Sequence, residues 1–215
     1  MSRTHRALFF FCHLAIAVSV AAAWGMMLFR AGNNGLLSTA GLGSLRYFTV
    51  LSNLMAGAAS LCCAVTALRG RAPGWTAAFQ FASAAAVLLT FMTVVVFLGP
   101  LLGYAAMYRG ANLWFHLIVP LLSVFAFCLL QDTPVRFLHT VTAVVPMLVY
   151  GVGYVLNILI NGIGERGNTN DWYGFLQWGW GPGVLIFCGM ILLTWGMAAA
   201  LRTAQQLRLK KAVDK

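Results

Sequence analysis

The sequence has very little charge. Only 8% of its 215 residues are charged and only four are acidic, whereas about a quarter of the residues of a typical soluble domain are charged. So few charges cannot solvate a globular surface in water. At the same time, 61% of the residues are hydrophobic and the mean hydropathy is +0.84. These values exclude an ordinary soluble domain and indicate a protein whose solvent is lipid.

Several kinds of chemistry lack the residues that they need. The four acids, Asp132, Glu165, Asp171 and Asp214, are too scattered for a paired-carboxylate mechanism. They lie in loops or in the tail, which also disfavours a proton-coupled transporter. The five cysteines lie within apolar runs without Cys-x-x-Cys spacing, as expected of small buried side chains rather than metal ligands. There is no glycine-rich phosphate loop and no Gly-x-Ser-x-Gly elbow, and we expect neither a metal ion nor another cofactor.

The net charge of +10 is concentrated at one end of the chain. Five of the fourteen basic residues lie in the last fourteen positions, and basic and aromatic residues do not alternate elsewhere. A basic segment after a final apolar helix is typical of a cytoplasmic anchor on anionic lipid rather than of a nucleic-acid-binding surface. We therefore expect a membrane and no nucleic acid as partner, and the sequence leaves the oligomeric state open.

Six apolar runs are long enough to cross a bilayer as helices, which takes about 20 residues. They cover approximately residues 7–29, 46–68, 76–101, 112–131, 137–162 and 182–203. The first run could be a signal peptide ending near Ala21-Ala22-Ala23, but it continues to Phe29 and five more runs follow, so we expect a retained helix. The prediction is an all-α polytopic membrane protein, with one six-helix domain over 1–203 and a basic cytoplasmic tail over 204–215.

The connecting segments differ in character. A Gly-, Asn- and Ser-rich stretch is expected to be a flexible loop, two segments are short turns, one is a short aromatic loop, and the longest is polar and then rich in Trp and Tyr. The flexible loop is expected at 30–45 and the two short turns at 69–74 and 132–136. The short aromatic loop is expected at 102–111 and the long polar segment at 163–181.

Ten of the basic residues fall on the side of the two termini and four on the other side. The excess predicts that both termini are cytoplasmic. Thr49, His116, the end of the fifth helix and the polar segment then lie at the same depth, near the outer surface.

Two groups of polar side chains near the outer ends of helices are candidates for chemistry. Thr49, Ser52 and Asn53 are spaced i, i+3, i+4 and therefore share one helix face. Hydroxyls there can bond back to the preceding turn, and Asn53 can tie two helices together. His116 is an ionisable residue inside an expected span. Pro120, four residues on, should bend the helix and leave the carbonyl of residue 116 without its helical donor.

The fifth expected helix carries a second polar stripe. Tyr150, Tyr154, Asn157 and Asn161 follow one another at i, i+4, i+7 and i+11. Such a stripe must face protein or water in a membrane. It predicts either contacts between helices or the wall of a polar cavity that opens to the outside, and the pattern does not decide between them.

A hydroxyl becomes a nucleophile when a base takes its proton. Thr49 and His116 are the residues that could form such a pair, with Asp171 or Asn157 orienting the imidazole. Ser52, Asn53, Tyr154 and Asn161 add further polar groups at the same depth.

These residues resemble the androgen-induced gene family of six-helix membrane proteins. The resemblance rests on Arg46-Tyr47-Phe48-Thr49, on His116 with Pro120, on the Tyr154 region and on Asp171-Trp172-Tyr173-Gly174-Phe175. The bacterial branch is similar in its Phe-Thr-x-x-Ser-Asn signature, which residues 48–53 fit throughout. Animal members hydrolyse fatty acid esters of hydroxy fatty acids with a threonine and a histidine.

The resemblance implies Thr49 as nucleophile, His116 as base and a bacterial cytoplasmic membrane as location. Our hypothesis is an intramembrane hydrolase of lipid esters near the outer leaflet, with Ser52, Asn53, Asn157 or Tyr154 as donors to the oxyanion. The alternative is a non-catalytic carrier or receptor that binds a small amphiphile in the same polar cavity.

Overall fold

The chain folds almost entirely into helices. The computed structural model describes residues 2–29, 41–70, 73–165 and 168–213, of which 84% are helical. The parts of the expected loops and turns at 30–40, 71–72 and 166–167 lie outside the described residues, as do the last two residues of the expected tail. Six helical segments are long and apolar enough to cross a membrane, which indicates an integral membrane protein.

Three of these segments are single helices and three are interrupted by turns. The elements in chain order are α1 (Arg3–Phe29), a 3-10 turn (Gly41–Arg46), α2 (Phe48–Arg69), α3 (Gly74–Thr93), a π-helical turn (Val94–Leu98), α4 (Gly99–Leu102), α5 (Tyr104–Met107), α6 (Ala111–Leu113), a π-helical turn (Trp114–Ile118), α7 (Val119–Phe125), a π-helical turn (Ala126–Leu130), α8 (Leu138–Thr142), α9 (Val145–Asn161), β1 (Gly164–Glu165), β2 (Asn168–Thr169) and α10 (Trp180–Val213). The strands pair antiparallel as a small hairpin.

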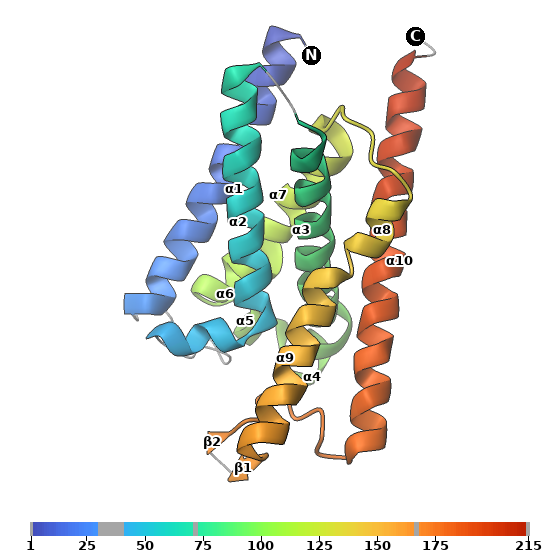
Figure 1. Cartoon of the computed structure of the whole chain (residues 1–215). Coiled ribbons are helices and arrows are strands. Elements are labelled where there is room, and N and C mark those ends of the chain that lie inside the picture. Colours follow the sequence, from blue (N-terminus) through green and yellow to red (C-terminus); the bar gives the residue numbers. More distant parts are fainter. Residues whose placement is uncertain (1, 30–40, 71–72, 166–167, 214–215) are drawn as a thin grey trace.

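The two termini lie at the same end of the bundle (Figure 1), which we call the termini end. The start of α2, α6 and the hairpin β1–β2 lie at the opposite end, which we call the loop end. Phe48 and His116 are therefore at the same end of the molecule, as the chain order of the expected spans predicts. The last helix is longer than expected, because α10 continues to Val213 and includes most of the expected tail.

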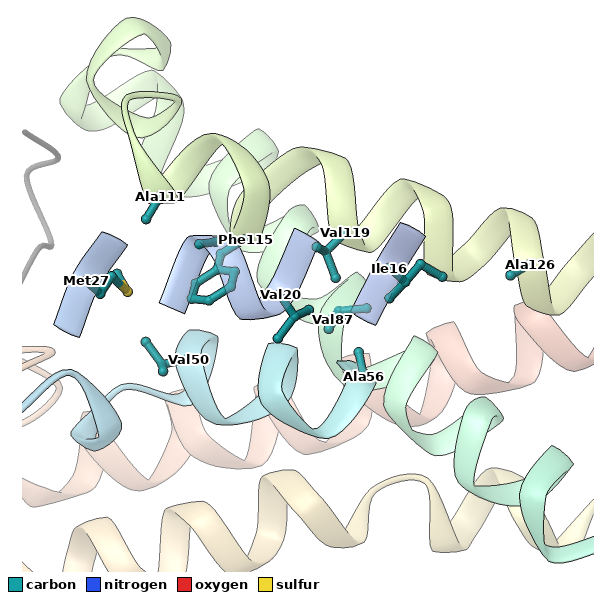
Figure 2. Packing of buried hydrophobic residues seen from close by; sticks show 11 residues of the cluster. Ile16, Val20, Met27, Val50, Ala56, Val87, Ala111, Phe115, Val119 and Ala126 are labelled. Carbon is teal, nitrogen blue, oxygen red and sulfur yellow. The ribbon is translucent and has the colours of Figure 1, made fainter. Parts of the chain in front are cut away.

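The main apolar core lies between α1, α2, α3 and the helix formed by α6 and α7. Figure 2 shows this cluster, in which side chains from all four segments interlock. The buried members are Ile16, Val20, Ala23, Met27, Val50, Ala56, Val87, Ala111, Phe115, Val119 and Ala126. By contrast, α9 and α10 expose many large apolar side chains, as expected of surfaces that face lipid.

A proline reshapes the helix that carries His116. Directly before Pro120, residues Trp114–Ile118 form a π-helical turn, in which the Val119 N–H bonds to the Trp114 carbonyl. Residue 120 has no N–H, so the carbonyl of Phe115 lacks both its α-type and its π-type backbone donor. The side-chain amide of Asn53 donates to that carbonyl instead, at 3.1 Å. The carbonyl that receives a donor from another helix is therefore that of residue 115, one position before the carbonyl singled out from the sequence.

The same arrangement recurs before Pro100. Residues Val94–Leu98 form a π-helical turn, and the Gly99 N–H bonds to the Val94 carbonyl. The Val95 carbonyl is left without a backbone donor, and the Tyr104 hydroxyl donates to it at 2.7 Å. A buried or lipid-facing carbonyl without a partner is costly, and in both helices a side chain supplies the missing donor.

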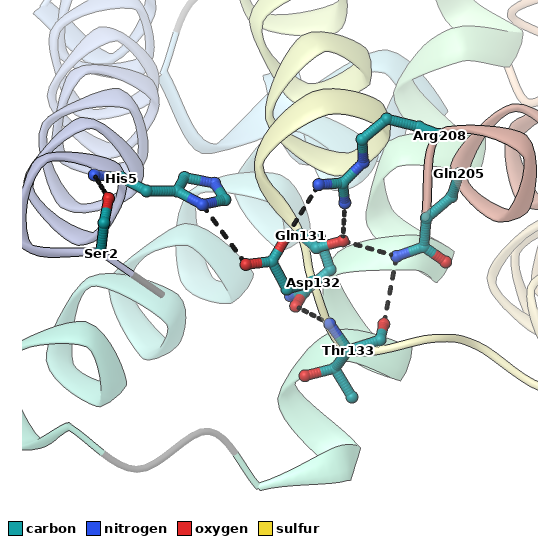
Figure 3. A network of polar contacts seen from close by, with 7 residues as sticks. All are labelled: Ser2, His5, Gln131, Asp132, Thr133, Gln205 and Arg208. Atoms are coloured by element: carbon teal, nitrogen blue, oxygen red, sulfur yellow. Dashed lines mark hydrogen bonds and ion pairs between the residues drawn. The ribbon is translucent and has the colours of Figure 1, made fainter. Parts of the chain in front are cut away.

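A polar network closes the termini end of the bundle (Figure 3). Asp132 accepts from Arg208 at 2.7 Å and lies 3.3 Å from the His5 ring, so it links α10 to α1. Arg208 also donates to the Gln131 carbonyl, and Gln205 donates to the carbonyls of Gln131 and Thr133. The basic extension of α10 is therefore held against the bundle rather than projecting from it.

Helices α9 and α10 approach closely at one glycine. A Cβ added at Gly151 would lie 1.6 Å from the ring of Phe187, whereas a Cβ at Gly153 would meet no atom within 4 Å. The absence of a side chain at residue 151 therefore allows Phe187 to pack between the two helices.

We predict that Gly151→Ala lowers the free energy of unfolding by about 1–3 kcal/mol, because the Phe187 ring must leave its position. Thermal unfolding in detergent measures this loss. Gly153→Ala, on the same helix, is the matched control and should leave stability unchanged or slightly raised. Equal destabilisation by the two substitutions would contradict the close approach at residue 151.

Candidate functional site

Thr49 lies at the loop end of α2 and faces the interior of the bundle. It belongs to a stripe of α2 that repeats every three or four residues, and all the later members of the stripe are buried: Asn53, Ala56, Ser60, Cys63 and Ala67. Thr49 itself is half-buried because it is the second residue of the helix. Its hydroxyl makes no hydrogen bond with any described residue. Tyr47, the residue before α2, has an extended backbone, so no turn of α2 precedes Thr49 and offers a carbonyl to which its hydroxyl could bond back.

Ser52 and Asn53 both donate to the backbone carbonyl of Thr49. The Ser52 hydroxyl does so at 3.1 Å and the Asn53 amide at 2.7 Å. The same Asn53 nitrogen donates to the carbonyl of Phe115. One amide group therefore ties the segment of Thr49 to the segment of His116, and it shows that the second and fourth spans touch, which the sequence left open.

The ring of His116 is buried and held by a backbone carbonyl. Its Nδ1 lies 3.2 Å from the carbonyl oxygen of Met107, at the end of α5. A carbonyl oxygen can only accept, so the neutral ring carries its proton on Nδ1 and keeps the lone pair on Nε2. The group that orients the imidazole is thus Met107, rather than the expected Asp171 or Asn157. No hydrogen bond joins His116 to Thr49.

The loop between β2 and α10, which contains Trp172 and Tyr173, covers the start of α2. The Tyr173 hydroxyl accepts the N–H of Phe48 at 2.9 Å, and so satisfies one free donor at the start of the helix. Removal of this hydroxyl from water raises the pKa of Tyr173 well above its usual value, so the phenol stays neutral. Tyr150 donates to the Arg46 carbonyl at 2.7 Å and accepts from the Trp172 indole. Helix α9 is therefore also joined to the start of α2.

Asp171 organises this loop. Its Oδ1 accepts from the Phe175 N–H and its Oδ2 from the Leu176 N–H, both at 2.9 Å, and the Tyr154 hydroxyl also donates to Oδ1. These donors occupy the carboxylate, which is buried although it lies in a loop. The structure thus brings Asp171 and Tyr154 together and does not bring Asp171 to His116.

The polar stripe of α9 divides into two parts. Tyr150 and Tyr154 face protein and form contacts between segments, which is the first of the two alternatives for this stripe. Asn157 and Asn161 lie nearer the end of the helix, where the Asn161 amide donates to the Asn157 side-chain oxygen at 3.0 Å. Asn161 is exposed. Neither asparagine has a hydrogen bond to His116 or Thr49.

Two buried donors near His116 were not identified from the sequence. The Asn112 amide nitrogen, one turn before His116, and the Trp24 indole nitrogen of α1 have no hydrogen-bond partner among the described residues. Trp24 packs against the core cluster and lies in the last part of α1, toward the loop end. The Asn53 side-chain oxygen is likewise without a partner. The only sequence signal was the polar identity of Asn112 four residues before a histidine.

An apolar groove lies between α9 and α10 at the loop end. It is lined by Tyr154, Val155, Ile158, Phe175, Leu176, Trp180, Gly183, Val184 and Phe187. These side chains offer almost no polar surface to the groove. An apolar group therefore fits the groove better than a polar molecule does.

Comparison of this chain with models of known protein families, with curated proteins and with solved structures finds no match. Functional inference therefore rests on the residues and their geometry. The described residues contain no group of three or more His, Cys, Asp or Glu side chains that could hold a metal ion.

We predict that Asp171→Ala speeds amide hydrogen exchange at Phe175 and Leu176 about tenfold or more, because both N–H groups lose their acceptor. Exchange measured by mass spectrometry on peptic fragments of the detergent-solubilised protein tests this. The control is Glu165→Ala, which removes an exposed acid from the neighbouring hairpin and should leave these two amides unchanged. Equal protection in Asp171→Ala and the parent protein would show that the carboxylate does not order the loop.

Proposed function

We propose that the protein is an intramembrane hydrolase of fatty acyl esters, with Thr49 as nucleophile and His116 as general base. The observation that carries the proposal is the state of His116: the Met107 carbonyl holds its Nδ1, which leaves the Nε2 lone pair available for a proton. This histidine belongs to the segment that Asn53 ties to Thr49. The resemblance to the androgen-induced gene family supports the same two residues.

The termini end is proposed to face the cytoplasm, because ten of the fourteen basic residues belong to it. The loop end with Thr49 and His116 is then in the outer leaflet. The similarity to the bacterial branch of the family favours a bacterial cytoplasmic membrane.

The proposed reaction has two steps. The Thr49 oxygen attacks the acyl carbonyl while His116 Nε2 takes the hydroxyl proton; the ester bond then breaks, and the proton passes to the leaving alcohol. In the second step His116 takes a proton from water, the hydroxide attacks the acyl-threonine, and the proton returns to the Thr49 oxygen. One water is consumed, and one acid and one alcohol are released. Because the two residues share no hydrogen bond, the substrate must draw them together on binding.

Buried donors without partners are suited to stabilise the oxyanion. The Asn112 amide and the Trp24 indole lie toward the loop end and have no partner among the described residues. A donor of this kind typically lowers the barrier by about 3 kcal/mol. Asn53 and Ser52 are less suited, because their donors already bond to the Thr49 carbonyl.

The groove between α9 and α10 is proposed to hold the acyl chain. It opens between two helices with lipid-facing surfaces, so a chain can enter sideways from the bilayer. Tyr154, which lines the groove, contacts the ring of Tyr173, and the Tyr173 hydroxyl accepts the N–H of Phe48 at the start of α2. The same groove favours the alternative function, a carrier that binds an amphiphile without cleaving it.

We predict that Thr49→Ala and His116→Ala each lower the rate of ester hydrolysis about 10³-fold or more, because either change removes the nucleophile or its base. Purified proteins in detergent–lipid micelles, assayed with a series of fatty acyl esters, give the rates. The matched control is Thr66→Ala, because Thr66 lies on the same helix with its hydroxyl bonded back to the Cys63 carbonyl. It should retain the full rate.

A fluorophosphonate probe separates the two functions. Labelling that is lost in Thr49→Ala but kept in Thr66→Ala supports the hydrolase. Saturable binding of a fatty acyl ester without labelling or hydrolysis supports the carrier and rejects the proposed mechanism.

We predict that Val184→Trp slows hydrolysis of long-chain esters about tenfold while short-chain esters are cleaved normally, because the indole fills the groove and only a long chain needs it. Rates for ester series of increasing chain length measure the effect. Leu185→Trp, at an adjacent position of α10 that is 73% exposed, is the control and should leave the chain-length profile unchanged. A uniform loss at all lengths in Val184→Trp would place the acyl chain elsewhere.

A further inference from the structure

A line of polar groups continues from the candidate site into the centre of the bundle. The interior-facing stripe of α2 carries only small or polar side chains from Thr49 to Ala67. Beyond Asn53, toward the termini end, the polar members of the stripe are Ser60 and Cys63, and both are buried. This stripe faces α1, α3 and α7, so a second set of polar residues meets it away from the loop end.

A histidine and a serine are hydrogen-bonded near the middle of the span. His13 of α1 and Ser60 of α2 lie at mid-depth, and His13 Nδ1 is 3.1 Å from the Ser60 oxygen. Both residues are buried, with 1% and 3% of their surface exposed. His13 Nε2 has no partner among the described residues. A neutral imidazole has one donor and one acceptor nitrogen, so either tautomer leaves one of them unsatisfied here.

A second serine is oriented toward the same interface. Ser123 of α7 is buried, and its hydroxyl has no partner in the described part of the chain. It lies one turn from Val119 and Ala126. Val119 and Ala126 belong to the same core cluster as Ile16 and Ala56 (Figure 2). Ile16 lies one turn from His13, and Ala56 lies one turn from Ser60. The free hydroxyl therefore belongs to the interface that contains the free imidazole nitrogen.

The polar line continues to the termini end through glutamines. Gln80 of α3 accepts from Gln131 at 2.6 Å and contacts the thiol of Cys63 at 3.7 Å. Its amide nitrogen has no described partner. Gln131 borders Asp132 and Arg208, which form the network of Figure 3. The line thus runs from the middle of the span to the termini end, and Asn53 lies two turns of α2 from Ser60 toward the loop end.

These free polar atoms call for a ligand that both donates and accepts. Eight buried side-chain nitrogen or oxygen atoms have no partner among the described residues. Six lie along this line: Trp24 Nε1, Asn53 Oδ1, Asn112 Nδ2, His13 Nε2, Ser123 Oγ and Gln80 Nε2. Each would cost about 1–3 kcal/mol if left unpaired. Water satisfies such scattered donors and acceptors in buried polar sites, whereas an apolar molecule satisfies none.

We propose that the interior of α1, α2, α3 and α7 binds a chain of water molecules, and that protons cross the membrane along it with His13 as the relay. The relay step is balanced: a protonated water gives a proton to Nε2, and Nδ1 passes its own proton to Ser60, whose hydroxyl proton moves to the next water. The neutral ring then carries its proton on Nε2, and a flip of the ring turns this N–H toward Ser60 and the free nitrogen toward the incoming proton. No oxidant or reductant takes part, and the step does not require ester hydrolysis.

Proton flux into liposomes tests the proposal. The full-length protein is reconstituted in vesicles that contain a pH-sensitive dye and a potassium gradient, and valinomycin sets the membrane potential. We expect the protein to raise proton entry about tenfold or more over empty vesicles. His13→Gln keeps a side chain that bonds water but cannot be protonated, and should return the flux to the background. His139→Gln, a histidine at the termini end outside the line, is the matched control and should conduct normally.

A second substitution avoids reliance on the histidine. Ser123→Val removes the free hydroxyl and fills its place with a larger apolar group, and it should also reduce the flux about tenfold. Thermal unfolding in detergent identifies any variant that does not fold, in which case the other variant decides. A parent protein that conducts no faster than empty vesicles overturns the proposal, as does an unchanged flux in the folded variants. Ester hydrolysis is measured on the same samples, so failure of one proposal is distinguished from failure of the other.

Discussion

The helix that carries His116 lacks one backbone N–H, because residue 120 is proline. In water the unpaired carbonyl would turn to solvent, but in a membrane it must find a donor inside the protein. The helix adapts by a π turn, which moves the unpaired carbonyl to Phe115, and Asn53 reaches across from α2 to satisfy it. That contact fixes the distance between the second and fourth spans at the loop end, and the position of Thr49 relative to His116 follows from it.

The same constraint explains most of the other polar side chains. Tyr104 supplies the donor that Pro100 removes, Asp171 accepts two N–H groups of a loop, and Tyr173 accepts the first N–H of α2. The polar groups of these side chains are therefore already hydrogen-bonded to backbone groups. Among the described residues, spare capacity remains toward the loop end at the Thr49 hydroxyl, the His116 Nε2 and the unpaired atoms of Asn112 and Trp24. It also remains deeper in the bundle, at His13, Ser123 and Gln80. Spare hydrogen-bonding capacity inside a membrane protein is costly, and it is the property that a reactive site needs.

The sequence predicted the fold class, the six spans and the level of Thr49 and His116, because span length and polarity depend on the bilayer rather than on tertiary contacts. It did not predict the π turns, since a proline shows where a donor is missing but not how the helix adapts. From the sequence, we expected Asp171 or Asn157 to orient the His116 ring, because a sequence pattern identifies polar side chains but not the positions of backbone carbonyls. The group found is the backbone carbonyl of Met107, which every residue type possesses. Likewise, the extension of α10 to Val213 depends on contacts with the loop at Gln131 and Asp132, far away in sequence.

The two interpretations of the run from Thr49 to Asn53 now apply to different residues within it. Ser52 and Asn53 have structural roles, since both donate to the Thr49 carbonyl and Asn53 also joins two helices. Thr49 differs because it is the second residue of α2 and follows the extended Tyr47, so no turn of α2 precedes it and offers a carbonyl to its hydroxyl. A threonine one turn further along would be tied to the backbone, as Thr66 is. The start of the helix is thus the place where a hydroxyl can face the bundle interior and remain available, and this is why we propose Thr49 rather than Ser52 as the nucleophile.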